Sequence, residues 1–488
     1  MTKFSVKLKQ LIEDSGINIY QLSKNAELDR TTIQRSITGA RLPSHAFVKK
    51  LCDYLRLSPF ERDELMVLYS IAKVGENTYA GRIHVKKLIE QIGELHLHGI
   101  SYENIKKSAR VFGDIEQEIN VISGQYHVNN MLRDLLEEEI FTANSPHISL
   151  TIPFNYTYLF DCLQHLYLGY KDQAVIEHIV RLSKNSHNEQ HKNVSLEMLS
   201  HVLPLAFCIG DGYRPHYYYA AETTVNDILV PMPYYLYTSK YLMTLSADFK
   251  TAILFNNGKI KDAYHNEFRK RLTQTVPFIQ PLANCEDMVS AYWDTLSTFG
   301  QLTGVIEPQP CLARFYTHKL VDDHLRLDVP EREAVKQGLY AFYDRYEEIT
   351  DHLKSFFSIE GLKHLVATGI MADLPPRYAL PFTIEERKHL LMILREDIRK
   401  DSFKARLIDP SKFLISSLAS IQLYKRNCLM FVAADSISGR SVACRIEEQS
   451  IYDAFLDFYE SLPDSDLLFC KEDTLHILDE FIEQLGNM

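Results

Sequence analysis

The sequence predicts a multidomain protein in which a small all-α head of five helices precedes a larger α/β body of mixed α+β type, with a candidate internal duplication. A chain of 488 residues is too long for one ordinary hydrophobic core. Apolar residues recur at helical spacing near the N-terminus, whereas later segments carry the β-branched and aromatic pattern of strands. A stretch that begins at Leu236 recurs at Leu423. These observations predict the two parts and the repeat.

The composition is that of a globular protein. Hydrophobic residues make up 46% and charged residues 24% of the chain, which excludes an intrinsically disordered protein. No apolar run approaches the roughly 20 residues that cross a bilayer, and the N-terminus does not resemble a signal peptide. The eight cysteines form no C-x-x-C pair. We therefore expect a cytoplasmic protein with reduced thiols, no membrane partner, no metal and no cofactor.

Charge is distributed unevenly along the chain. Residues 1–57 carry a net charge of +5, and the remaining residues carry a net charge of −16. A small basic part on a large acidic part is typical of a protein that contacts a polyanion with one end only.

Three short helices are expected first. The first helix ends at Gly16, and its apolar stripe consists of Phe4, Leu8, Leu11 and Ile12. Asp29 stands where its carboxylate can accept backbone N–H bonds at the start of the third helix, which runs from Arg30 to about Ile37. Gly39 ends that helix.

Two further helices complete the head. The fourth is expected from Ser44 to Leu55 and the fifth from Pro59. The segment Ser58 to Glu61 has the pattern of a capping box with proline at the first helical position.

Five short helices in this order resemble the lambda-repressor/Cro-like helix-turn-helix family, over roughly residues 4–70. The matching stretches are Leu22-Ser23, Leu28 to Ile33, and Gly39. Two residues depart from the family's pattern. Ile19 stands where the family places a glutamine that contacts the DNA backbone, and Glu27 stands at the glycine of the turn.

The resemblance implies that the third helix reads double-stranded operator DNA in the major groove. The implied base contacts come from Arg30, Thr31, Gln34 and Arg35, and the expected DNA-binding set also includes Thr32 and Arg41. Arginine reads guanine and glutamine reads adenine with paired hydrogen bonds. Because one head makes few contacts, a homodimer on paired half-sites is expected.

Beyond the head, taken as residues 1–70, four segments are expected. A helical connector covers 71–112, with Ile83, Leu88, Ile89 and Ile92 on one face. A first α/β half covers 113–280, a helical insertion or connector covers 281–383, and a second α/β half covers 384–488. The first half begins with a strand in EINVISG, a helix from His127 to Phe141 and a strand in HISLTIPF. A strand meander over 234–256 and a helix from Ile260 to Leu272 end it.

The duplication is predicted from two related stretches. LYTSKYLMTLSAD (236–248) and LYKRNCLMFVAAD (423–435) share six of thirteen positions. A similar amphipathic helix follows each, beginning near Ile260 and Ile451. Before them, LLEEEI (135–140) leads into a strand as ILREDI (393–398) does. Helix, strand, meander and helix thus recur in the same order.

Two such halves are similar in outline to the phospholipase-D-like fold. That family's catalytic motif is H-x-K-x(4)-D, in which the histidine attacks phosphorus. The two H-x-K triplets here begin at His84 and His352, and Gln91 and Ile359 stand where the aspartate belongs. The resemblance therefore implies a sensor with no catalytic residues, and a non-enzyme.

The sequence predicts a transcription regulator whose body senses a small-molecule or peptide ligand, oligomerises, or does both. A candidate pocket wall consists of Tyr217, Tyr219, Tyr235 and Tyr237, whose hydroxyls could meet a ligand. Two alternatives stay open. One is a peptide-signal receptor with a helical peptide-binding body, although no 34-residue repeat is visible. The other is a phosphodiester-acting enzyme of the phospholipase-D-like type.

Overall fold

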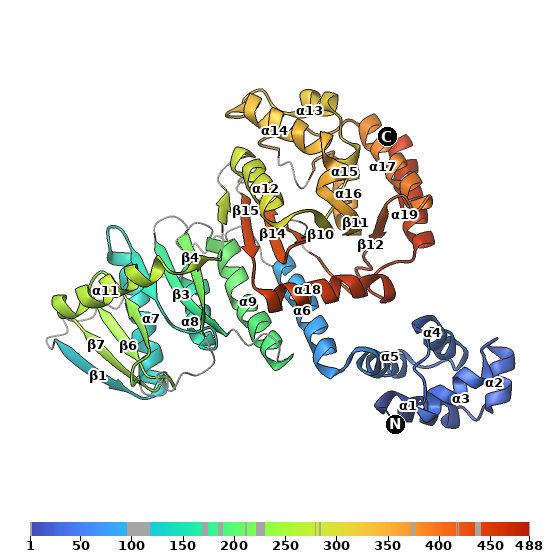
Figure 1. Ribbon diagram of the computed structural model, residues 1–488, viewed down its shortest axis with the longest axis horizontal. Helices are drawn as coiled ribbons and strands as arrows, with labels where there is room; N and C mark the ends of the chain where they lie inside the picture. The colour runs from blue at the N-terminus through green and yellow to red at the C-terminus, as the bar shows by residue number, and fades with distance from the viewer. Residues whose placement is uncertain are drawn as a thin grey trace. The chain divides into compact units, whose positions relative to one another are not determined.

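The computed structural model divides the chain into two compact units, Met1–Val85 and Lys86–Met488, which are described separately below (Figure 1). The described residues are 2–94, 118–167, 174–183, 189–209, 212–220, 230–278, 280–282, 285–371, 376–415, 417, 419–434 and 441–487. Part of the expected connector, 95–112, lies outside the described residues.

Five helices form the head, which confirms the sequence prediction. They are α1 (Lys3–Asp14), α2 (Ile19–Asn25), α3 (Arg30–Thr38), α4 (His45–Tyr54) and α5 (Pro59–Val74). A polar side chain caps the start of each, and the predicted capping box at Ser58 is present. Their apolar stripes meet in one core in which Leu8, Ile33, Val48 and Leu65 have no exposed surface. Helix α6 (Glu76–Glu94) follows.

The body begins with an eight-stranded sheet in the order β1-β7-β6-β5-β2-β3-β4-β8. Its strands are β1 (Ile119–Ser123), β2 (His147–Leu150), β3 (Val175–Ser183), β4 (Tyr213–Ala220), β5 (Tyr234–Tyr237), β6 (Leu242–Leu245), β7 (Thr251–Phe255) and β8 (Val276–Pro277). Strands β2, β3 and β4 are parallel, and the other pairs are antiparallel.

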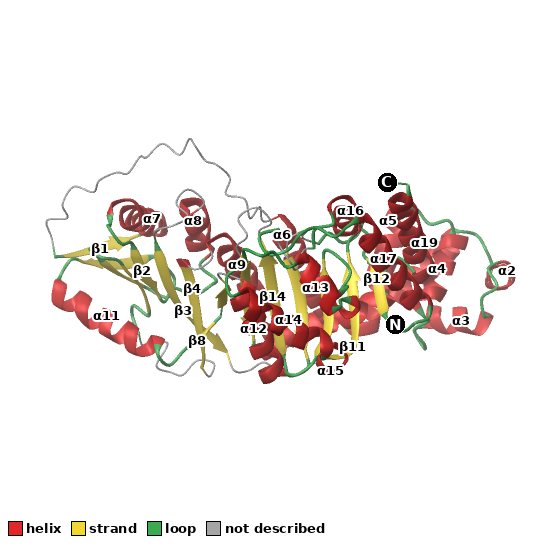
Figure 2. Ribbon diagram, turned by 90° about the horizontal axis from the view of Figure 1, so that it is seen from above, coloured by secondary structure: helices red, strands yellow, loops and turns green. Residues whose placement is uncertain are grey.

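Helices cover both faces of this sheet. Figure 2 shows α7 (Gln125–Thr142) and α8 (Thr157–Tyr167) on one face and α11 (Gly258–Leu272) on the other. Helix α9 (Glu189–Ile209) leads into β4. The predicted strands, helices and meander of this half are all present.

A second, seven-stranded sheet has the order β12-β11-β10-β13-β14-β15-β9. Its strands are β9 (Gln280–Leu282), β10 (Leu302–Glu307), β11 (Thr350–Phe357), β12 (Lys404–Leu407), β13 (Ala419–Tyr424), β14 (Cys428–Ala434) and β15 (Ser441–Ile446). Its helices are α12 (Cys285–Phe299), α13 (His318–His324), α14 (Arg332–Asp344), α15 (Tyr346–Ile349), α16 (Ile359–Thr368), α17 (Ile384–Arg399), α18 (Gln449–Ser461) and α19 (Lys471–Gly486).

The two sheets share one topology, which confirms the duplication. The order β1-β7-β6-β5-β2-β3-β4 in the first corresponds to β9-β15-β14-β13-β10-β11-β12 in the second. The three strands β10, β11 and β12 are parallel, as β2, β3 and β4 are. The repeated stretches form the hairpins β5–β6 and β13–β14, and α11 and α18 follow the two meanders.

Two details of the sequence interpretation are wrong. The stretch 393–398 lies in α17 and leads into β12, the counterpart of β4, whereas 135–140 lies in α7 and leads into β2. The counterpart of α7 is α12. The segment 281–383 is not a helical insertion alone, because it contains β10 and β11, two interior strands of the second sheet. Amphipathic helices before strands look alike in sequence whichever strand they precede.

Candidate DNA interface and ligand cavity

Helix α3 owes its position to polar groups at both ends. The Asp29 carboxylate accepts hydrogen bonds from the backbone N–H of Thr32 at 2.6 Å and from the Thr32 hydroxyl at 2.6 Å. The side-chain hydrogen bond from Thr32 lowers the pKa of Asp29. At the other end Gly39 adopts φ 77°, a left-handed conformation that suits glycine. The boundaries of the proposed reading helix are therefore set locally.

The turn between α2 and α3 keeps a left-handed residue without a glycine. Glu27 stands there with φ 51°. Its neighbours Ala26 and Leu28 are buried, and the Ser23 hydroxyl donates a hydrogen bond to the Leu28 carbonyl at 2.6 Å. The burial of Ala26 and Leu28 and the hydrogen bond from Ser23 to Leu28 hold Glu27 in this left-handed conformation.

One face of α3 is left for a partner. Arg30, Thr31, Gln34 and Arg35 are exposed, as is Arg41 beyond the helix. Ile33 and Ser36 point into the core, with 0% and 1% exposure. Within the described part of the chain, none of the three arginines forms an ion pair. Thr32 differs from the others, because it is half-buried and its hydroxyl is engaged with Asp29.

The start of α2 lacks the polar contact that the resemblance implies. Ile19 is half-buried and packs against the head core, so it offers no hydrogen bond to a phosphate. Asn18 caps the helix, and its side-chain oxygen accepts a bond from the Gln21 N–H at 2.9 Å.

The four tyrosines do not form one pocket wall. Tyr217 and Tyr219 lie on β4, whereas Tyr235 and Tyr237 lie on β5, and β2 and β3 separate these strands. The ring of Tyr217 packs edge-on against Phe278 at 5.7 Å. Tyr235 packs on Tyr264 of α11 at 5.1 Å. The register places the two pairs on opposite faces of the sheet. Spacing along the chain could not reveal this separation.

A cavity of about 130 Å³ lies instead on one face of the second sheet. Strands β10, β13 and β14 form its floor, with Val305, Gln422 and Val432. Helices α12, α14 and α15 cover it with Met288, Tyr292, Trp293, Phe342, Tyr343 and Tyr346. Helix α18 packs on the opposite face, where Phe455 meets Phe431 at 5.5 Å. The clusters YW at 292–293 and FYDRY at 342–346 are the signal that sequence reasoning missed.

The polar groups in the cavity wall are held in place. The Glu307 carboxylate accepts a hydrogen bond from the buried Ser355 hydroxyl at 2.8 Å. The Gln422 amide donates to the Tyr292 hydroxyl at 2.8 Å and accepts from the Tyr424 hydroxyl at 2.8 Å. The wall therefore combines aromatic surface with a few oriented polar groups, which is the usual make-up of a ligand site.

The roof of the cavity comes from a connection that is longer in the second half than in the first. In the first half, residues 151–174 join β2 to β3; in the second, residues 308–349 join β10 to β11 and include α13, α14 and α15. Gly338 lets α14 approach α12, since a Cβ there would lie 2.7 Å from a methyl of Val289. The longer connection thus forms the roof.

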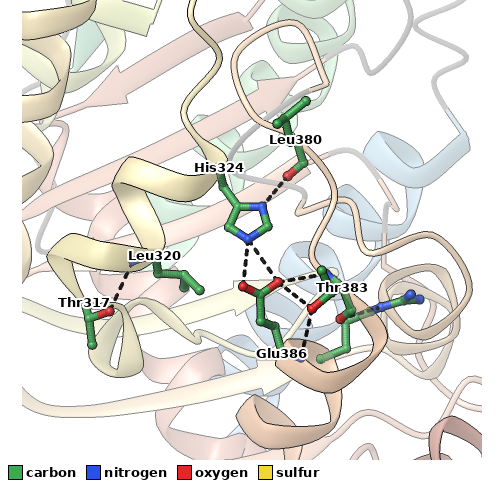
Figure 3. Close-up of polar contacts among 7 residues, drawn as sticks. Thr317, Leu320, His324, Leu380, Thr383 and Glu386 are labelled. Carbon is green, nitrogen blue, oxygen red and sulfur yellow. Dashed lines mark hydrogen bonds and ion pairs between the residues drawn. The ribbon is translucent and has the colours of Figure 1, made fainter.

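A buried histidine fastens this roof to α17 (Figure 3). The ring of His324, at the end of α13, lies 3.1 Å through Nδ1 from the Leu380 carbonyl and 3.0 Å through Nε2 from the Glu386 carboxylate. Burial by itself would raise the pKa of Glu386, but hydrogen bonds from His324 and Thr383 lower it.

The cavity brings aromatic side chains and a few oriented polar groups together on one face of a sheet. It is therefore a candidate binding site.

The H-x-K triplets that could carry phosphodiester chemistry begin on two different elements. His84 lies on α6 and His352 on β11. Over the described residues, no group of three or more His, Cys, Asp or Glu side chains is arranged to hold a metal ion.

The described helices include none that is long and apolar enough to cross a membrane.

Comparison with known proteins bears on the head. Residues 7–61 match the Cro/C1-type HTH DNA-binding domain. No curated protein matches the chain. Among solved structures, the chain is similar to TrmBL2, an archaeal chromatin protein, at 12% identity and a TM-score of 0.23 over 45% of this chain and 72% of that one. It is also similar to phosphatidylserine synthase of Haemophilus influenzae, at 7% identity and a TM-score of 0.21 over 76% of this chain and 94% of that one.

Proposed function

We propose that this chain, which carries a Cro/C1-type helix-turn-helix domain over residues 7–61, is a transcription regulator whose body binds a small molecule. The observation that carries the DNA-binding part is the exposed face of α3. Arg30, Thr31, Gln34 and Arg35 project from it without a partner in the head core. These are side-chain types that read base edges in the major groove.

We propose further that the protein acts as a homodimer on paired half-sites. One head presents a single reading helix and few cationic side chains, which is little for specific affinity. The acidic body would repel DNA and leave contact to the heads.

The DNA-binding proposal is tested on operator sequences selected from random duplexes with the full chain. Arg30→Ala and Arg35→Ala are each expected to cost about 1–3 kcal/mol of binding free energy, because each removes one base-reading side chain. Lys9→Ala, on α1 and paired with Glu13, is the control for loss of one positive charge. Mobility shifts at fixed salt give the affinities. Parental affinity in both α3 variants would show that another surface reads DNA.

The cavity supports small-molecule binding. A volume of about 130 Å³ matches the size of a small organic molecule. The described body is built on two mixed sheets and is not purely helical. Sensing requires that the ligand prefer one of two arrangements of the protein.

The enzymatic alternative has a direct test. We expect the purified protein not to hydrolyse nucleic acid or phosphodiesters, with or without divalent metal, because Gln91 and Ile359 replace the aspartate of both candidate motifs. Hydrolysis that disappears in His84→Ala or His352→Ala would establish an enzyme instead.

A further inference from the structure

Each of the two described sheets ends in two edge strands, and three of these edges are protected against pairing with another strand. Native sheets blunt an edge with proline, charged side chains or very short strands. Strands β8 and β9 are short and contain Pro277 and Pro281. Strand β12 carries Lys404 and Arg406. The remaining edge strand, β1, contains neither proline nor a charged residue (Figure 1).

Strand β1 has the sequence INVIS and an alternating pattern of exposure. Ile119 is 51% exposed and Val121 is 68% exposed, and Ser123 is exposed on the same face. The pairing of β1 with β7 is regular from Ile119 to Ser123. The strand therefore presents a regular, uncharged and largely apolar edge, which is the kind of edge that another strand recognises.

The backbone groups of the exposed residues point away from β7, the single neighbour of β1 among the described strands. In an antiparallel pair, a residue directs its N–H and C=O to the same neighbour, and the next residue directs them to the other side. The Glu118 carbonyl accepts the Asn256 N–H at 3.0 Å, and the Gly124 N–H donates to the Lys250 carbonyl at 2.8 Å. The even-numbered residues of β1 therefore bond to β7, whereas the odd-numbered residues direct their N–H and C=O outward.

This edge is complementary to a second copy of itself. When two β1 strands pair antiparallel about Val121, Val121 faces its own counterpart and Ile119 faces Ser123 of the second copy. Each facing pair directs N–H and C=O groups at the other residue, so each pair exchanges hydrogen bonds in both directions. The side chains of Ile119 and Val121 then lie against the second copy on one face of the sheet and lose contact with water.

The charges beside β1 fit the same pairing. Glu118 of one copy lies level with Gly124 of the other, and Lys250 lies beside Gly124 in register. Strands lie about 4.8 Å apart, and glycine has no side chain, so the Lys250 ammonium can reach across to the Glu118 carboxylate. The nearby Asp248 carboxylate accepts hydrogen bonds from the Ser246 hydroxyl and the Lys250 N–H within its own turn. The facing strand ends therefore carry opposite charges.

We infer that two copies of this chain associate through β1, which joins their first sheets into one continuous sheet across a two-fold axis. The junction is antiparallel, and the same residues contribute from both copies. The inference gives a surface to the homodimer proposed above, and it rests on that proposal only for the presence of a second copy. DNA has no part in it.

The test measures self-association of the full-length protein without DNA, by sedimentation velocity over a range of concentrations. The parent chain is expected to form a dimer. Val121→Lys places two ammonium groups opposite each other at the two-fold axis, so the dissociation constant should rise at least about tenfold. Val276→Lys is the matched control and should associate as the parent does, because Val276 is a 44% exposed valine on β8, the other edge of the same sheet.

A conservative variant tests the register directly. In a pair that exchanges hydrogen bonds, the Cα atoms lie about 5.5 Å apart, which is a distance that a disulfide spans. Val121→Cys should therefore form a covalent dimer on mild oxidation, visible on a non-reducing gel. Val276→Cys and the parent chain, which both retain the exposed Cys470, give the background.

Three results would overturn the inference: a monomeric parent chain, parental association in a folded Val121→Lys, or no more covalent dimer in Val121→Cys than in Val276→Cys. A monomeric parent chain would assign β1 to a different partner strand. Failure of the proposed function gives a different pattern. In that case the dimer and its cross-link form as expected, but operator DNA shows no mobility shift.

Discussion

At the scale of single residues, Glu27 occupies a position where the helix-turn-helix family that the head resembles has glycine. Its φ of 51° is a conformation that costs a residue with a Cβ about 1–2 kcal/mol. The ordered structure on both sides, with buried Ala26 and Leu28, outweighs this cost. The head therefore forms this left-handed turn at some cost in stability.

Glu27→Gly is expected to stabilise the head by about 0.5–1 kcal/mol, because relief of strain exceeds the added freedom of the unfolded chain. Glu13→Gly, within α1, is the matched control and should destabilise it by about 1 kcal/mol. Thermal unfolding followed by circular dichroism measures both. Loss of stability in both variants would contradict the strain argument.

Glu177 of β3 joins three elements of the first half. Its carboxylate accepts hydrogen bonds from Arg269 of α11 at 2.9 and 2.7 Å and lies 2.9 Å from the ring of His147 on β2. Burial alone would raise its pKa, but the bonds to His147 and Arg269 lower the pKa of Glu177 to about 2. The group thus binds its proton less readily in the folded than in the unfolded chain.

The stabilisation from Glu177 is therefore fully present above the pKa of the unfolded chain, near 4.5, and is lost as the pH falls towards 2. Glu177→Gln is expected to lower stability by about 2 kcal/mol at pH 7 and by much less near pH 2. Denaturant unfolding at several pH values measures this difference. Glu267→Gln, on the exposed side of α11, is the control, and an equal loss at both pH values would contradict the assignment.

At the scale of elements, the connection that roofs the cavity differs between the two halves of the duplicated body. The counterpart of β2–β3 has grown into α13, α14 and α15, and these helices roof the cavity. The His324–Glu386 contact ties the roof to α17, and the close approach at Gly338 ties it to α12. The size of the cavity depends on the spacing between α12 and α14, and a methyl group added at Gly338 would change that spacing.

Gly338→Ala is expected to push α14 away from α12 or to strain the contact with Val289, at a cost of about 1–3 kcal/mol. Because Trp293 lies on α12, its emission should shift in the same variant. Gly258→Ala, at the start of α11 where a Cβ meets nothing within 4 Å, is the control. Unchanged melting temperature and emission in Gly338→Ala would show that the roof is loosely packed.

At the scale of the whole molecule, the proposed regulator needs communication between cavity and head. Coupling between two sites is typically 1–3 kcal/mol and is reciprocal, so a ligand of the body and operator DNA must change each other's affinity by the same factor, roughly 5- to 150-fold. A small molecule that copurifies with the full-length protein is titrated with and without operator, using Trp293 as the reporter. Equal ligand affinity in the two titrations would contradict the coupling.

Local pattern was enough for much of this molecule. The five head helices, the caps at Asp29 and Ser58 and the exposed arginines of α3 follow from spacing within a few residues. The duplication was also visible, because the hairpins β5–β6 and β13–β14 keep related residues at equal positions. Helix caps and hairpins are formed by neighbours in the chain, and neighbours can be read from the sequence.

Tertiary structure alone decided the rest. It put Tyr217 and Tyr235 on opposite faces of a sheet, with β2 and β3 between their strands. It also placed β10 and β11 inside a segment that the sequence predicts to be helical. It also brought Glu307, Trp293 and Phe342 from three separate elements to one cavity. Which strands become neighbours, and how far apart two helices pack, depend on contacts between residues distant in sequence. The periodic pattern of apolar residues within one segment does not encode those contacts.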